Sequence, residues 1–131
     1  MNVRPRINRW TQSRRNLIFD LSIKSSLVQP HFIVSGEGID EPISSMPGIN
    51  RQSVDKLIET ISNDMELGIC SHMLFPVVDE HDKDSYASKA SDMNMPLQIA
   101  VKELKKMYGN DIVLFTDVCL CTATDLSLIH I

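Results

Sequence analysis

The chain has 131 residues, of which 43% are hydrophobic and 23% are charged, a composition typical of a folded globular domain. A net charge of -4 argues against a nucleic-acid binder that relies on overall charge, and no apolar run is long enough to cross a bilayer. Three cysteines are an odd number and too few for a disulfide scaffold, so we expect a reducing compartment and a cytoplasmic protein.

The first 16 residues are predicted to form an N-terminal arm. They are basic, contain one aromatic residue, Trp10, and show no convincing periodicity. A flexible, solvated arm is the first interpretation, an arm that folds onto a partner chain is the second, and nucleic-acid binding is the third. The arm lacks the apolar core of a secretory signal, and its arginines without an acid leave an organelle transit peptide as an alternative to the cytoplasm.

Strands and helices alternate after the arm. Residues 27–34 (LVQPHFIV) and 70–78 (CSHMLFPVV) are predicted strands, and the second is apolar enough to be covered on both faces. Residues 53–67 form the clearest helix, because apolar residues recur on one face and Gly68 is placed to end it. A second helix is expected from Pro96 to Gly109. Between these elements, we expect a long structured loop at 36–50 and a polar, solvated loop at 79–92.

The last predicted strand begins at Ile112, in the stretch IVLFTDVCLCTAT. The order strand, helix, strand, helix, strand predicts parallel strands joined by right-handed crossovers, with an open sheet edge on each side. Beyond the apolar residues, alternation in an extended strand would direct Asp117, Cys119 and Cys121 to one side. The two cysteines are either zinc ligands or buried structural thiols, because two ligands alone do not make a closed metal site.

Three phrases of the sequence resemble one enzyme family. They are EPISSMPGINRQS at residues 41–53, MLFPVV at 73–78 and TDVCLCTAT at 116–124, and RPRINRW at 4–10 is similar to the arginine-rich start of that family. The family is porphobilinogen synthase, also called delta-aminolevulinic acid dehydratase. The resemblance implies α/β structure, the N-terminal portion of a (β/α)8 TIM barrel with about three parallel strands and two helices, after an extended N-terminal arm. Residues 1–16 would be the arm, 17–125 the partial barrel and 126–131 a tail that does not match the family.

The resemblance also implies a reaction and a metal. Family members condense two molecules of 5-aminolevulinate into porphobilinogen with loss of water, in tetrapyrrole and heme biosynthesis, as homo-octamers held by the N-terminal arm. Asp117 would line the substrate site and Phe75 would border it. Cys119 and Cys121 would be two of the three cysteine ligands of a catalytic zinc, since magnesium-dependent members carry other residues there. The resemblance leaves open whether the parent enzyme also binds magnesium as an allosteric ion.

Two departures from the family predict that this chain alone is inactive. The H-G-H-C-G motif, which carries the third zinc cysteine, does not follow Asp125, and the context of His130 does not support it as a substitute ligand. We therefore expect a truncation, a frame error or an artificial end. The Schiff-base lysines are absent as well, because every lysine here is predicted to be a solvated charge: Lys24, Lys56, Lys83, Lys89, Lys102, Lys105 and Lys106. The alternative function is a non-catalytic assembly module that contacts full-length subunits.

Four histidine and aspartate residues are predicted to have structural or solvated roles rather than to bind metal. His81, Asp82 and Asp84 are predicted to be solvated charges of the polar loop rather than metal ligands. His72, within a predicted strand, is expected to be a core histidine with its hydrogen bonds satisfied.

Overall fold

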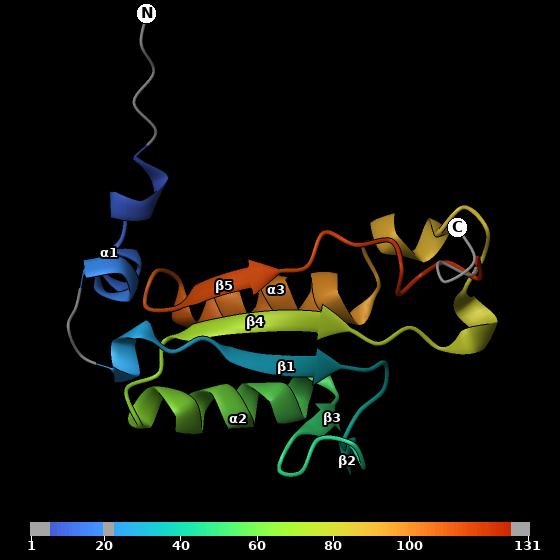
Figure 1. Cartoon of the computed structure of the whole chain (residues 1–131), viewed down its shortest axis with the longest axis horizontal. Coiled ribbons are helices and arrows are strands. Elements are labelled where there is room, and N and C mark those ends of the chain that lie inside the picture. The colour runs from blue at the N-terminus through green and yellow to red at the C-terminus, as the bar shows by residue number, and fades with distance from the viewer. Residues whose placement is uncertain (1–5, 20–22, 127–131) are drawn as a thin grey trace, which may run out of the picture.

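The computed structural model describes residues 6–19 and 23–126 and has a five-stranded sheet with helices on one face (Figure 1). The strand order is β2-β3-β1-β4-β5, and all neighbours are parallel except β2 and β3. The strands are β1 (Gln29–Ile33), β2 (Asp40–Pro42), β3 (Asn50–Gln52), β4 (Ser71–Pro76) and β5 (Val113–Thr116). The helices α2 (Val54–Glu66) and α3 (Pro96–Tyr108) lie side by side on this sheet. The predicted order of parallel strands and helices is confirmed.

The helices α2 and α3 form where the apolar stripes predicted them. Leu57 and Ile61 of α2 are fully buried, and Gly68 adopts the left-handed φ of +91° just after the helix ends. In α3, Pro96 occupies the first turn, where its missing N–H costs nothing. The ammonium of Lys105 donates to the carbonyls of Gly109 and Ile112 at 3.0 and 2.9 Å, so this lysine closes the end of α3. Burial, and secondarily Arg14, lowers the pKa of Lys105, which corrects its prediction as a purely solvated charge.

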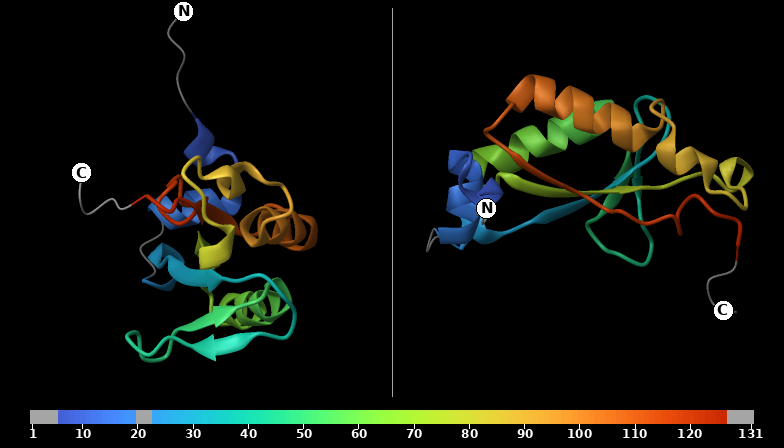
Figure 2. Two further views of the ribbon diagram at one scale, coloured as in Figure 1. Left: turned by 90° about the vertical axis from the view of Figure 1, so that its right-hand side faces the viewer. Right: turned by 90° about the horizontal axis from the view of Figure 1, so that it is seen from above.

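The core lies between these helices and the three long parallel strands. Its fully or nearly fully buried members are Ile33, Leu57, Ile61, Leu74, Ala100, Leu104 and Ile112. The opposite face of the sheet has no helix layer within the described residues, as Figure 2 (right) shows. On that face Phe32 stacks on Phe75, with ring centroids 5.5 Å apart, and Phe115 is 38% exposed. The prediction that residues 70–78 are covered on both faces therefore holds for one face only.

The predicted loop at 36–50 contains strand β2 and ends where strand β3 begins. Strand β2 pairs with β3 in antiparallel register, with Asp40 opposite Gln52 and Pro42 opposite Asn50. The Asp40 carboxylate accepts hydrogen bonds from the Asn50 and Gln52 amides at 2.7 and 3.1 Å. Pro42 fits because β2 is an edge strand, where a missing N–H is tolerated. The hairpin also covers the edge of β1 that the sequence predicted to be open.

The predicted arm contains helical structure. The short helix η1 (Ile7–Arg9) precedes α1 (Gln12–Phe19), which continues past the boundary predicted at residue 16. The Ser13 hydroxyl donates to the Asn110 carbonyl at 2.6 Å, so α1 rests against the amino-terminal end of the sheet (Figure 1). Trp10 and Phe19 remain 73% and 60% exposed. Among the described residues, none of the helices combines the length and apolar character that crossing a membrane requires.

The core packing predicts the response to truncating a buried leucine. Leu57→Ala should lower the free energy of unfolding by about 2–5 kcal/mol, because it leaves a cavity between α2 and the sheet. Leu67→Ala is the matched control, since Leu67 is 59% exposed, and should change it by less than about 0.5 kcal/mol. Urea denaturation followed by circular dichroism measures both. Equal losses for the two variants would contradict this assignment of the core.

Candidate functional site

The predicted substrate residues lie at the carboxyl edge of the sheet. The last pair between β4 and β5 is Leu74 with Thr116, so Phe75 on β4 and Asp117 just after β5 are the next residues along the chain. Both side chains are partly buried. The carboxyl ends of parallel strands are where barrel proteins assemble their active sites. The structure thus brings Phe75 and Asp117 to one edge, as the sequence predicts.

The two cysteines lie beyond the strand rather than in it. Strand β5 ends at Thr116, and residues 121–123 form a turn in which the Ala123 amide donates to the Leu120 carbonyl at 3.0 Å. The strand alternation predicted as far as Cys121 is therefore wrong. Cys119 and Cys121 nevertheless come together, joined as a disulfide with their Cα atoms 5.5 Å apart. Cys121 is exposed and Cys119 half-buried, so they are not buried structural thiols.

We call residues 117–124 the cysteine loop. Segment 79–95 contacts this loop and fixes its position. Asp84 and Thr124 form an isolated parallel bridge, in which the Asp84 amide donates to the Ala123 carbonyl at 3.3 Å. Beneath the bridge, a small apolar cluster joins the two segments through Val78, Ala87, Met95 and Ala123. The Asp84 carboxylate accepts from the Tyr86 and Ser88 amides at 2.9 and 3.0 Å, and the bonds from Ser88 lower its pKa most. Asp84 is therefore a structural anchor of the cysteine loop rather than only a solvated charge.

The donor set at the cysteine loop fits a thiolate-binding metal only in part. Two sulfurs that can touch are close enough to share one ion, and reduction of the disulfide would supply two soft thiolate ligands. The remaining cysteine, Cys70, lies just before β4, at the opposite end of that strand. Burial, followed by the charge of Asp111, raises the pKa of its thiol. Cys70 therefore does not complete the set, and His130 lies outside the described residues.

The lysines of segment 79–92 are paired with acids of their own segment. Lys83 contacts Glu80 at 2.5 Å, and Lys89 lies 3.7 Å from Asp82 and 3.6 Å from Asp92. His81 is 79% exposed, 3.6 Å from Asp82, as expected for a solvated charge. A Schiff-base lysine needs a desolvated pocket, and Lys83 and Lys89 are instead paired with acids of their own segment.

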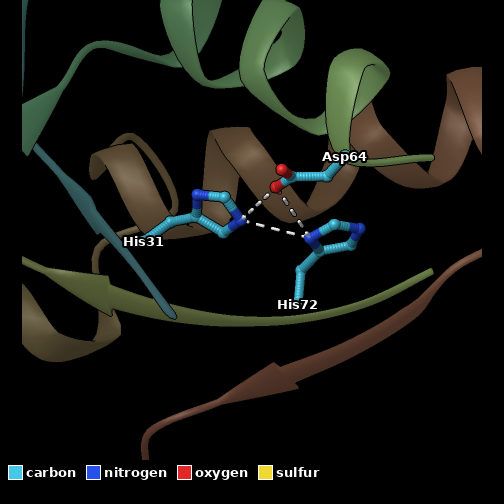
Figure 3. Close-up of side chains that lie close together, drawn as sticks. All are labelled: His31, Asp64 and His72. Carbon is cyan, nitrogen blue, oxygen red and sulfur yellow. Dashed lines mark hydrogen bonds and ion pairs between the residues drawn. The ribbon is translucent and has the colours of Figure 1, made fainter. Parts of the chain in front are cut away.

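A second cluster, which the sequence analysis does not bring together, lies between the sheet and α2 (Figure 3). It consists of His31 on β1, His72 on β4 and Asp64 on α2. His31 Nε2 lies 3.1 Å from His72 Nδ1, and Asp64 Oδ2 lies 3.7 Å from the former and 3.9 Å from the latter. The His31 and His72 side chains are 3% and 0% exposed and that of Asp64 is 17% exposed. We call these three residues the His–Asp–His cluster.

Burial governs the charges of the His–Asp–His cluster. It lowers the pKa of both histidines to about 4, with the charge of His72 contributing second at His31, and it raises the pKa of Asp64. Within the described part of the chain, Asp64 Oδ2 and His72 Nε2 have no hydrogen-bond partner. His72 is therefore only half satisfied, which corrects its prediction as a fully bonded core histidine.

A sequence signal for this cluster existed at each position. His31 and Ile33 share one face of β1, and His72 and Leu74 share one face of β4, so alternation directs both histidines toward the helices. Asp64 lies three residues after Ile61, within the buried stripe of α2. A polar residue on each of three buried faces is unusual, but only the pairing of β1 with β4 brings the residues together.

The chain was compared with known proteins. A family model described as Delta-aminolevulinic acid dehydratase matches residues 2–127. The delta-aminolevulinic acid dehydratase of Mycobacterium tuberculosis is 35% identical over 123 residues, which cover 93% of this chain and 37% of that protein. That of Methanothermus sociabilis is 38% identical over 112 residues, with coverages of 85% and 34%. Both relatives are thus about three times as long as the region that this chain matches.

A solved structure shows the same arrangement of elements. It is the crystal structure of delta-aminolevulinic acid dehydratase (porphobilinogen synthase) from Toxoplasma gondii, in complex with the reaction product porphobilinogen. The TM-score is 0.75 at 32% sequence identity, and the match covers 95% of this chain and 35% of that chain.

The His–Asp–His cluster predicts that acid destabilises the metal-free chain. Between about pH 6.5 and 4 the unfolded histidines bind protons that the folded ones do not, so stability is complete above this window and falls as pH decreases. The raised pKa of Asp64 has the opposite effect. Above about pH 3.8 its carboxyl group binds more protons in the folded chain than in the unfolded chain, which offsets part of the loss of stability. Urea denaturation with a chelator present should show a net loss of about 1–3 kcal/mol between pH 7 and 4.5.

Two variants isolate this effect from general acid sensitivity. His72→Leu removes one of the two titrating histidines and should flatten the profile, whereas the exposed His81→Ala should leave it as in the parent chain. A stability that is level across the window in the parent chain would contradict the burial of neutral histidines.

Proposed function

The chain belongs to the delta-aminolevulinic acid dehydratase family, and on that premise we propose that it is a portion of a zinc-type porphobilinogen synthase. Its sheet and helices correspond to a portion of the TIM barrel of that family. The observation that carries the proposal is the meeting of the Cys119 and Cys121 sulfurs just beyond the carboxyl end of β5. This is the edge at which barrel enzymes hold their catalytic groups.

The proposed reaction is the condensation of two molecules of 5-aminolevulinate into porphobilinogen with loss of water. Phe75 and Asp117 would border and line the substrate site, because each directly follows a member of the Leu74–Thr116 pair at that edge. Cys119 and Cys121 would hold zinc once reduced, and the bound ion would polarise and orient a substrate molecule as a Lewis acid. The bridge between Asp84 and Thr124 would fix the cysteine loop over the barrel mouth.

The proposed site needs groups that these residues do not supply. The two thiolates leave a third protein ligand missing among the described residues, and the lysines of segment 79–92 are held as ion pairs. The chain spans about a third of the length of the curated relatives it matches. We therefore propose that this chain contributes the zinc thiolates and part of the substrate wall, and that catalysis requires the remainder of a barrel.

Reconstitution tests this division of the enzyme. The reduced chain would be incubated with zinc and 5-aminolevulinate, alone and with a polypeptide that carries the part of the Mycobacterium tuberculosis relative beyond the matched region. We expect porphobilinogen above a buffer blank only in the mixture. Cys119→Ser with Cys121→Ser should abolish it, while Cys70→Ser, at the far end of β4, should not. Product from the chain alone, or an undiminished rate with the double serine variant, would refute the proposal.

The second candidate function is an assembly module that contacts full-length subunits. The observation in its favour is that the arm exposes Ile7 and Trp10 by 53% and 73%, and that Phe19 and Ile23, soon after the arm, are 60% and 80% exposed. Four exposed apolar residues near one another in the sequence are typical of a surface that folds against a partner. Under this proposal, the arm would contact subunits of the homo-octamer that the full-length enzyme forms.

Co-purification tests the assembly role. A tagged full-length dehydratase co-expressed with this chain should retain it, and Trp10→Ala with Phe19→Ala should reduce the retained amount at least about tenfold, because their apolar area would no longer be buried. Met93→Ala is the control, since Met93 is 75% exposed but lies outside the arm. Equal retention of all variants would exclude the arm as the contact.

A further inference from the structure

The His–Asp–His cluster has the composition and shape of a metal site that is separate from the cysteine loop. We propose that His31, Asp64 and His72 bind one divalent transition-metal ion of the zinc class. Two imidazole nitrogens and one carboxylate oxygen are a common donor set for such ions. The three ligands come from β1, α2 and β4, so a bound ion would tie the helix to both central strands (Figure 3).

The spacing of the donor atoms is close to that of a coordination shell. The separations are 3.1, 3.7 and 3.9 Å. Ligand atoms arranged tetrahedrally at about 2.0–2.1 Å from zinc lie about 3.3 Å from one another. Each pair therefore needs to move by well under 1 Å to close on an ion. Residues on two hydrogen-bonded strands and one packed helix are held near these positions before any metal binds.

The charges and unpaired atoms favour a cation at this point. Asp64 Oδ2 is buried and has no hydrogen-bond partner within residues 6–19 and 23–126, although an unpaired buried acceptor costs about 1–3 kcal/mol. A metal ion would satisfy this oxygen and offset the burial of its charge. Both histidines are neutral at physiological pH, as their lowered pKa values require, and neutral imidazole is the form that ligates metals.

A cavity lies beside one member of the cluster, His31. It has a volume of about 250 Å³ and is lined by His31, Gln29, Gln52 and Thr60, among others. Thr60 lies one helical turn before Asp64 on α2, but Asp64 and His72 do not line the cavity. A water molecule would fill the fourth coordination position that three protein ligands leave.

The position of the cluster separates it from the proposed catalytic metal. His72 is the second residue of β4 and lies near the amino end of that strand, on the face packed against the helices. The cysteine loop lies beyond the carboxyl end of β5. The ligand chemistry differs too, with nitrogen and oxygen in the cluster and sulfur in the loop. The inferred ion is therefore structural in position, and it does not depend on the proposed catalytic function.

Metal content measured in a thiolate-free background tests the proposal. Untagged full chain carrying Cys119→Ser and Cys121→Ser would be dialysed against zinc, then against metal-free buffer, and analysed by mass spectrometry. We expect about one zinc per chain and a raised thermal unfolding midpoint. His31→Leu with His72→Leu should lose the zinc and the shift, and the apolar replacements should keep the chain folded by circular dichroism. His81→Ala, in the exposed group of Asp79, His81 and Asp82, is the control and should keep both.

Cobalt substitution identifies the ligands independently. The cobalt-loaded serine background should show the visible bands of four-coordinate cobalt without the near-ultraviolet band of thiolate ligation, and Asp64→Asn should weaken cobalt binding at least about tenfold. The same zinc content in the His31→Leu, His72→Leu chain as in its parent would overturn the proposal. So would the absence of bound zinc in the parent, which would identify a metal-free hydrogen-bonded cluster.

Discussion

The packing of α2 and α3 onto one face of three parallel strands is the constraint on which the other features depend. Ile33 and Leu74 from the sheet meet Leu57 and Leu104 from the helices, and these contacts fix the strands in parallel register. Parallel register places every strand's carboxyl end at one edge, where Phe75, Asp117 and the cysteine loop follow. The same packing encloses the His–Asp–His cluster between sheet and helix.

Much of this arrangement could be predicted from the sequence because its causes are local. The apolar stripes of α2 and α3 and the glycines that follow them define both helices to within a residue or two. The parallel direction of β1, β4 and β5 follows from the alternation of strands with helices. Asp117 could be predicted to lie at a strand end from the run of apolar residues before it alone.

The differences arise where distant residues decide the local structure. The hairpin of β2 and β3 depends on Asp40 bonding to Asn50 and Gln52, which the glycines and prolines between them obscured. The chain leaves β5 at Thr116 because the bridge from Asp84 draws Thr124 toward segment 79–95, and no pattern near the cysteines indicates that contact. In the sequence, His31 and His72 each stand as a single polar residue in an apolar strand. Only strand pairing and the placement of α2 bring them together with Asp64.

The chain belongs to the delta-aminolevulinic acid dehydratase family and spans about a third of the length of the curated relatives it matches. Its sheet edge carries the cysteine pair, the carboxylate and an aromatic wall, while its helix-covered face carries a histidine cluster of different chemistry. The central claim is that Cys119 and Cys121 are zinc ligands once reduced. X-ray absorption at the zinc edge tests it most directly, on the reduced chain with His31→Leu and His72→Leu and a limiting amount of zinc. The account predicts two sulfur ligands at about 2.3 Å, and a shell of nitrogen and oxygen alone would contradict it.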